Sequence, residues 1–158
     1  MTSKGRQTIK KPVFRELSGV EADEILARNS VGRLARSIGD RIDIELIHYV
    51  VLDRCIYGVT SREPVFPTQA HNGRAAFEVD EILDLFEWSS VVVKGTIEIV
   101  SAGAEGNTDP ILAPGVQRLR ALVPVAPVSA RPPSVEYYVF RLLVDTMTGR
   151  GAGVPKTG

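Results

Sequence analysis

Few residues in this sequence are of the types that carry nucleophilic or metal chemistry, and they are scattered. The chain has one cysteine, Cys55, and two histidines, His48 and His71, so no group of residues has the spacing of a metal site. Cys55 lies in an apolar segment with no base beside it, which favours a small packed residue over a nucleophile. We therefore expect neither a bound metal nor thiol chemistry.

His48 and Trp88 have the side chains best suited to a planar ligand. An imidazole titrates near neutral pH, so His48 could act as an acid or hydrogen-bond donor; the alternative is a partly buried strand histidine. The indole of Trp88 could stack on a planar heterocycle; the alternative is a core or interface residue. Both pairs of alternatives stay open at this point.

Thr60 and Ser61 follow a strand-like segment, where short hydroxyls and backbone N–H groups often bind phosphate. A second polar feature is a group of four carboxylates: Asp80, Glu81, Asp84 and Glu87. They lack the spacing of a calcium loop, which favours a solvated connection over a cation site.

Length and charge narrow the class of protein. The 158 residues suit one domain, and nineteen basic residues balance nineteen acidic ones. The charge balance gives no reason to expect nucleic acid or a membrane as a partner, and favours a small-molecule ligand. The sequence has neither a run of about 18 apolar residues nor a signal-type segment, so we expect a cytoplasmic protein.

The pattern of apolar residues predicts a mainly β domain with a few short helices. Ser18 and Glu21 have the spacing of a capping box, which predicts a helix ending near Asn29 with Ala22, Ile25 and Leu26 on its buried face. The strands expected after it are 31–38, 41–50, 55–60, 74–80, 89–100 and 136–146, with a short helix at 116–122. We expect residues 1–14 to be a flexible segment, residues 15–148 to form a single antiparallel barrel domain, and residues 149–158 to be a flexible tail.

The strand from Arg41 to Val50 alternates, but both of its faces carry apolar residues. Ile42, Ile44 and Leu46 share one face, whereas Ile47 and Tyr49 share the other with Asp43 and Glu45. We expect the face of Ile47 and Tyr49 to be the outer one, passing under a partner or a ligand.

Several short motifs fall in an order typical of one family. They are Leu17-Ser18, Val31-Gly-Arg-Leu-Ala35, His48-Tyr-Val-Val51, Ile56-Tyr57, Thr60, Arg74-Ala-Ala-Phe-Glu-Val-Asp80 and Trp88-Ser-Ser-Val-Val-Val-Lys-Gly95. Together they resemble the pyridoxamine 5′-phosphate oxidase-like proteins over roughly residues 15–148, and most closely the small flavin-binding branch that includes the nitroimidazole-resistance proteins.

The resemblance implies a split antiparallel β-barrel that forms a homodimer and holds FMN in grooves between the subunits. The flavin ring would lie along the strand at Ile47, His48 and Tyr49. Its ribityl-phosphate would meet the strand end at Val59, Thr60, Ser61 and Arg62. The partner would supply Trp88, Ser89 and Ser90, and the apolar run that follows them fits an interface strand.

The phosphate-binding segment departs from the family pattern. Where relatives have a glycine and a lysine, this chain has Glu63 and Val65, so a carboxylate is added and an ammonium is lost. Arg62 could replace that cation, because its planar guanidinium binds phosphate well. Gly58 stands where relatives have a bulky residue, which predicts extra space.

Two functions are consistent with these residues. The first is an FMN-dependent oxidoreductase, in which the cofactor carries the chemistry and no side chain is an obligatory catalyst. The second is a split-barrel binding module that has lost the flavin-phosphate site, either free of cofactor or loaded with a deazaflavin coenzyme or with haem. For haem, His48 would be the axial ligand.

Overall fold

The computed structural model describes residues 11–38, 40–60, 73–102, 110–123 and 138–153. Within these ranges the chain forms seven strands and two helices. They are β1 (Val13–Glu16), α1 (Gly19–Arg28), β2 (Val31–Ile38), β3 (Arg41–Leu52), β4 (Cys55–Thr60), β5 (Arg74–Asp84), β6 (Glu87–Ala102), α2 (Ala113–Leu122) and β7 (Tyr138–Gly153).

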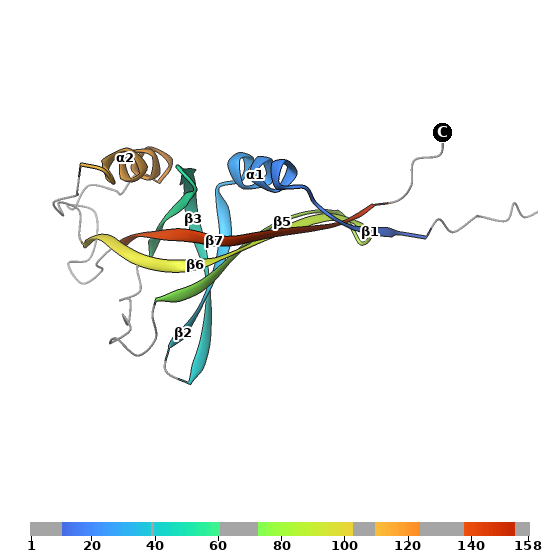
Figure 1. The fold of residues 1–158 in the computed structure, drawn as a ribbon, viewed down its shortest axis with the longest axis horizontal. Coiled ribbons are helices and arrows are strands. Elements are labelled where there is room, and N and C mark those ends of the chain that lie inside the picture. Colours follow the sequence, from blue (N-terminus) through green and yellow to red (C-terminus); the bar gives the residue numbers. More distant parts are fainter. Residues whose placement is uncertain (1–10, 39, 61–72, 103–109, 124–137, 154–158) are drawn as a thin grey trace, which may run out of the picture.

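The strands form one antiparallel sheet in the order β1-β7-β4-β3-β2-β5-β6, and β6 also pairs with β7. That last pairing closes the sheet into a ring, so the predicted split barrel is confirmed. In Figure 1 the β2–β3 hairpin extends from the ring in one direction, and the ends of β5, β6 and β7 extend with β1 in another. No helix in the described part of the chain is long and apolar enough to cross a membrane.

Helix α1 begins at the predicted capping box. The Ser18 hydroxyl accepts a hydrogen bond from the Glu21 N–H at 3.3 Å, and the Ser18 N–H donates to the Glu21 carboxylate at 2.9 Å. The predicted stripe of Ala22, Ile25 and Leu26 is buried against the ring. The sequence therefore predicted this helix, its start and its buried face correctly, because all three depend on local residues.

Glu21 makes the stability of the fold depend on pH in the acid range. Its pKa is lowered from 4.5 to about 2, first by the Arg15 guanidinium and then by the backbone and hydroxyl of Ser18. A carboxyl whose pKa is depressed by folding stabilises the folded state above the unfolded pKa and loses that effect as pH falls through the folded pKa. We expect the urea midpoint of the wild type to fall between pH 4.5 and pH 2 more steeply than that of Glu21→Gln. Equal slopes for the two proteins would contradict this assignment.

Strand β3 is oriented opposite to the prediction. Ile47 and Tyr49 are 1% and 0% exposed and face the core, whereas Ile42, Ile44 and Leu46 are 78%, 62% and 68% exposed. Tyr49 faces the core because its ring packs edge-on against that of Phe77, with centroids 4.8 Å apart, and its hydroxyl donates a hydrogen bond to the Leu26 carbonyl at 2.8 Å. The apolar residues near the start of β3 are therefore left on the outside of the ring.

The inner face of the same hairpin carries charge. Arg36 on β2 and Glu45 on β3 form an ion pair at 3.2 Å, with their side chains only 12% and 10% exposed. The Thr60 hydroxyl, at the end of β4, donates to the other Glu45 oxygen at 3.1 Å. One carboxylate thus links three neighbouring strands inside the ring.

Gly58 does not leave free space, contrary to the expectation from the sequence. A Cβ at this position would lie 2.3 Å from Cζ of Phe140 and 2.8 Å from Cγ2 of Ile47. The Phe140 ring, 1% exposed, fills the space that a larger residue would take. The missing side chain is therefore compensated inside the core and opens no pocket there.

The bounds of several strands differ from those predicted, and β1 was not predicted. Strand β7 continues to Gly153 instead of ending at Thr146, because β6 and β1 both pair with its last residues. Strands β5 and β6 also extend into the acidic segment, so Glu81 and Asp84 lie on β5 and Glu87 on β6. The side chains of Arg28 and Asn29 donate hydrogen bonds to Glu81, which ties the end of α1 to β5.

Candidate functional site on the outer face of the barrel

The first group of predicted site residues lies where β3 and β4 pair. His48 is exposed on the outer face, and its Cα is paired with that of Val59, which is half-buried. Val31 of β2 pairs with His48 on the other side. His48 and Val59 are therefore brought together on the outer face, where His48 is accessible to a ligand and Val59 packs against the apolar cluster under α2.

Ile47 and Tyr49, the neighbours of His48, turn their side chains into the core. Burial, and secondarily the charge of Glu81, raise the pKa of the Tyr49 hydroxyl above its ordinary value. A phenol held in this way does not ionise near neutral pH and has its donor committed to Leu26. Ile47 and Tyr49 can therefore contribute to an outer-face site through backbone groups, whereas His48 can contribute its side chain.

Only some of the residues predicted to bind phosphate lie in the part of the chain that the structure describes. Thr60 is 5% exposed, and its hydroxyl points to Glu45 inside the ring. Ser61 and Arg62, together with Glu63 and Val65, lie outside the described residues. Of the predicted phosphate donors, the structure thus places Thr60, and its hydroxyl is engaged by a carboxylate.

The second group lies at the start of β6. Trp88, Ser89 and Ser90 are half-buried around a shallow depression of about 380 Å³. The indole of Trp88 lies against the ring of Phe14 on β1, with centroids 6.2 Å apart. The indole of Trp88 and the hydroxyl of Ser90 share one face of β6 at this hollow, which gives the region the means to hold an aromatic ligand, whereas the Ser89 side chain points to the opposite face, toward Gly151.

Charged residues that sequence reasoning missed line the same depression. The Arg33 guanidinium binds Asp80 and, at 3.1 Å, Glu78, whose other oxygen accepts a hydrogen bond from the Ser90 hydroxyl at 2.9 Å. Hydrogen bonding to Asp80 is the main cause that raises the pKa of Arg33. One guanidinium beside two carboxylates makes the floor of the depression slightly acidic, which suits a neutral or cationic group better than a phosphate.

The two groups share the outer face but stay apart within one chain. Strands β2 and β5 separate β3 from β6, so His48 and Ser90 are roughly 14 Å apart at a strand spacing of about 4.8 Å. Because both groups are on the same face of the sheet, within one chain they do not lie on opposite sides of a planar ring.

Cys55 is on the same face of β4 as Val59 but at the other end of the strand. It is half-buried against the cluster of Tyr57, Val116 and Val139 under α2. Burial is the main cause that raises the pKa of its thiol, with Arg141 acting in the opposite direction. A nucleophilic thiol needs a depressed pKa, and that of Cys55 is raised. These surroundings therefore agree with a packed cysteine.

The closed antiparallel ring with α1 and α2 on it defines a split-barrel protein. The chain belongs to the pyridoxamine 5′-phosphate oxidase-like family, because residues 19–151 match the family model described as pyridoxamine 5′-phosphate oxidase. No protein of curated function matches the chain in sequence.

Solved structures support the same fold. An FAD-binding protein from Mesorhizobium loti is similar with a TM-score of 0.67 and 23% identity, covering 89% of this chain and 99% of its own. An FAD-binding protein from Mycobacterium smegmatis has a TM-score of 0.58 and 22% identity, covering 86% and 98%. A haem storage protein from Vibrio cholerae has a TM-score of 0.58 and 12% identity, covering 86% and 93%. At these identities the likeness establishes the fold and leaves the ligand open.

Proposed function

We propose that this protein is a flavin-binding homodimer of the oxidoreductase type that holds FMN between its subunits. The observation that carries the proposal is the separation of the two site groups on one outer face. Because His48 and Val59 lie about three strand spacings from Trp88 and Ser90, a second copy facing the first is the simplest means of bringing both groups to one ligand.

Each group has a role in this arrangement. The backbone of β3 around His48 supports the ring, and the end of β4 at Val59 and Thr60, with Ser61 and Arg62 after it, receives the ribityl-phosphate. The partner subunit's Trp88, with Ser89 and Ser90 of the partner subunit, covers the other side of the ring. A bound flavin supplies electron transfer between a donor such as a reduced nicotinamide and a small acceptor. The protein orients the ring and excludes water from it.

The relatives support a planar redox cofactor as a class. Two of the similar structures are described as FAD-binding and one as haem-storing. FMN and the nitroimidazole-resistance branch are the finer parts of our proposal. They rest on the sequence motifs from Val31 to Gly95.

A second candidate is a binding module without flavin, and one observation favours it. The Thr60 hydroxyl donates its hydrogen bond to Glu45 inside the ring, so it is not directed toward a phosphate at the end of β4. The segment that follows β4 also contains the carboxylate of Glu63, which would repel a phosphate. Haem is a variant of this candidate, with the exposed imidazole of His48 as a possible ligand. A Soret band on addition of haemin, lost in His48→Ala, would distinguish haem from both other readings.

Trp88 provides the sharpest test of the proposed site. Trp88→Ala is expected to weaken FMN binding about tenfold, which corresponds to the upper end of the energy of one aromatic pair. Trp88→Phe keeps a stacking ring and is expected to lose less affinity for FMN. Binding is followed by quenching of flavin fluorescence, and Leu122→Ala, on the exposed side of α2, is the control for a remote truncation. Equal affinities for Trp88→Ala and Leu122→Ala would contradict the placement of the ring.

A further inference from the structure

The imidazole of His48 emerges from an apolar part of the outer face. The Cα of His48 is paired with that of Val31 on β2 and with that of Val59 on β4. Along β3, Leu46 and Val50 lie on the same face, two residues away in either direction. The imidazole is exposed at the centre of these aliphatic side chains, so a planar molecule that rests on them meets it.

No carboxylate lies beside this imidazole in the described part of the chain. The neighbouring strands β2 and β4 contain none, and Asp43 and Glu45 of β3 alternate to the opposite face. Arg33 is the charged residue on the same face of β2, and its guanidinium is bound to Glu78 and Asp80 of β5. The strands around the imidazole therefore offer it no counter-charge.

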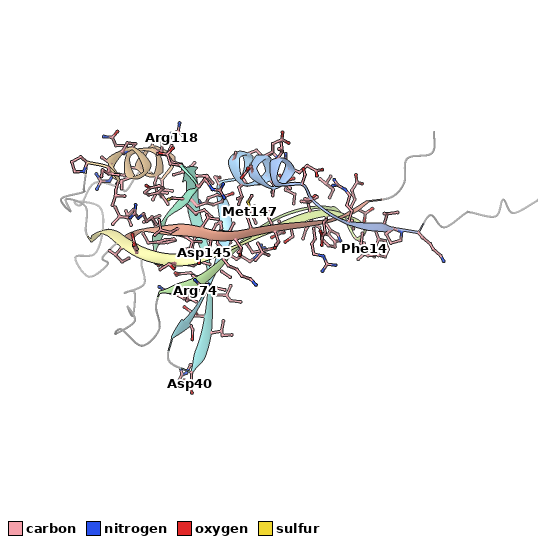
Figure 2. All side chains as sticks on the ribbon, in the orientation of Figure 1. Phe14, Asp40, Arg74, Arg118, Asp145 and Met147 are labelled. Atoms are coloured by element: carbon pink, nitrogen blue, oxygen red, sulfur yellow. The ribbon has the colours of Figure 1, made fainter. Side chains whose placement is uncertain are left out.

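The other titratable groups near the imidazole add no negative charge. On β4 these groups are Cys55 and Tyr57, and burial is the main cause that raises the pKa of both. Helix α2 also packs against β3 and carries Arg118, which Figure 2 labels, and Arg120, both exposed. Among the residues that the structure describes, a positive charge on His48 would have no partner, so it would be balanced by negative charge on a bound molecule.

A flavin acquires such a charge when it is reduced. The oxidised ring is neutral. A hydride from a reduced nicotinamide carries two electrons and one proton, and it leaves the ring with one negative charge on its pyrimidine half. A cation beside the ring therefore stabilises the reduced form more than the oxidised form.

We propose that His48 takes up one proton from solvent when the bound flavin is reduced, and that the resulting imidazolium balances the charge of the ring. The inference rests on the flavin-binding function proposed above and assigns the side chain that tunes the reduction potential there. The ring gains two electrons and one proton from the donor, and His48 gains one proton from water. When the electrons pass to the acceptor, His48 returns its proton to solvent.

The proposed proton uptake makes the preference for reduced flavin depend on pH. Imidazole loses its proton as pH rises through the neutral range, and a negative charge beside it keeps the proton bound to higher pH. The extra affinity for reduced flavin is therefore present at about pH 7 and lost by about pH 9, above the range in which imidazole titrates.

Measuring the affinities of the full-length protein for oxidised and reduced FMN tests the assignment. Flavin fluorescence gives the affinity for oxidised FMN, and spectroelectrochemical titration of the complex with dithionite as reductant gives the affinity for the reduced form relative to it. For the wild type, this ratio should be about tenfold higher at pH 7 than at pH 9, which corresponds to about 30 mV for a two-electron couple.

Two substitutions of His48 separate its charge from its shape. His48→Gln keeps a hydrogen-bonding side chain without a titratable charge, so the ratio should be low and the same at both pH values. His48→Lys keeps a cation at both pH values, because lysine titrates near pH 10.4, so the ratio should stay high at pH 9. A merely structural role would change the affinities for oxidised and reduced FMN equally. His71 is present in every variant, so its contribution cancels in the comparison.

Arg41→Gln is the matched control for the loss of one positive charge from the same strand. Arg41 lies beside Asp40 at the tip of the β2–β3 hairpin, which points away from the rest of the protein in Figure 2. It is seven residues from His48 along β3, or roughly 23 Å at about 3.3 Å per residue, and the Debye length is about 8 Å at physiological ionic strength. The ratio should not change in this variant.

Two results would overturn the role of His48: a wild-type ratio that is the same at pH 7 and pH 9, or a His48→Lys protein whose ratio at pH 9 is as low as that of His48→Gln. Circular dichroism verifies that each variant is folded. If neither form of FMN binds the wild type, the proposed function fails and this inference fails with it. If both forms bind with a ratio independent of pH, the assignment of His48 alone fails.

Discussion

Replacing Gly95 by alanine is expected to lower the free energy of unfolding by about 3 kcal/mol, at the upper end of what overpacking costs. A Cβ at this position would lie 1.9 Å from the carbonyl oxygen of Leu143 and 2.9 Å from its carbonyl carbon. These atoms belong to the backbone of β7, which pairs with β6 on both sides of an irregularity at Lys94 and Gly95. The clash can be relieved only by moving the strand pair that closes the ring.

Equilibrium unfolding in urea measures this loss. Gly19→Ala is the matched control, because a Cβ there meets nothing within 4 Å, and its free energy of unfolding should change little or rise slightly. A Gly95→Ala protein as stable as the control would mean that β6 and β7 do not approach each other as the structure shows.

The second large effect is expected for Arg36→Met, which should destabilise the fold by about 3 kcal/mol. Removal of the guanidinium leaves the Glu45 carboxylate in a site where only 10% of its side chain is exposed. The remaining hydrogen bond from Thr60 does not replace the lost cation.

The double variant Arg36→Met, Glu45→Met separates this cause from lost packing. The double variant leaves no uncompensated charge in the site, so it should be more stable than Arg36→Met alone, and the two substitutions should not be additive in urea unfolding. Additive losses would show that Arg36 acts through packing and not through Glu45.

The parts of the fold that depend on local residues were predictable from the sequence. The start of helix α1 follows from Ser18 and Glu21, and its buried face from Ala22, Ile25 and Leu26. The end of β7 was missed because its pairing with β1 joins residues from the two ends of the chain. Such a contact leaves no local signal.

The orientation of β3 shows what an alternating sequence pattern cannot predict. Period two assigns residues to faces but does not say which face is inside when both carry apolar side chains. Here the choice depends on Phe77 and Leu26, which hold Tyr49 inward, and on Arg36, which forms an ion pair with Glu45 in the interior. The apolar side chains of Ile42, Ile44 and Leu46 are therefore left exposed on the outer face.

For the candidate site, the aromatic residues stood out in the sequence more clearly than the polar ones. Trp88 and His48 stand out by residue type, and both reach the outer face. Arg33, Glu78 and Asp80 do not stand out, because their proximity depends on the pairing of β2 with β5. The inward turn of the Thr60 hydroxyl depends on Glu45 of the neighbouring strand in the same way.

The most direct test of the central claim is the absorbance spectrum of the purified, untagged protein before and after addition of FMN, with the bound flavin titrated by fluorescence. Our account predicts a flavin band that stays with the protein, one FMN per subunit, and binding that is micromolar or tighter. A folded dimer that retains no flavin even at high FMN concentration would contradict it, and the cofactor-free binding module would then be the better description of this split barrel.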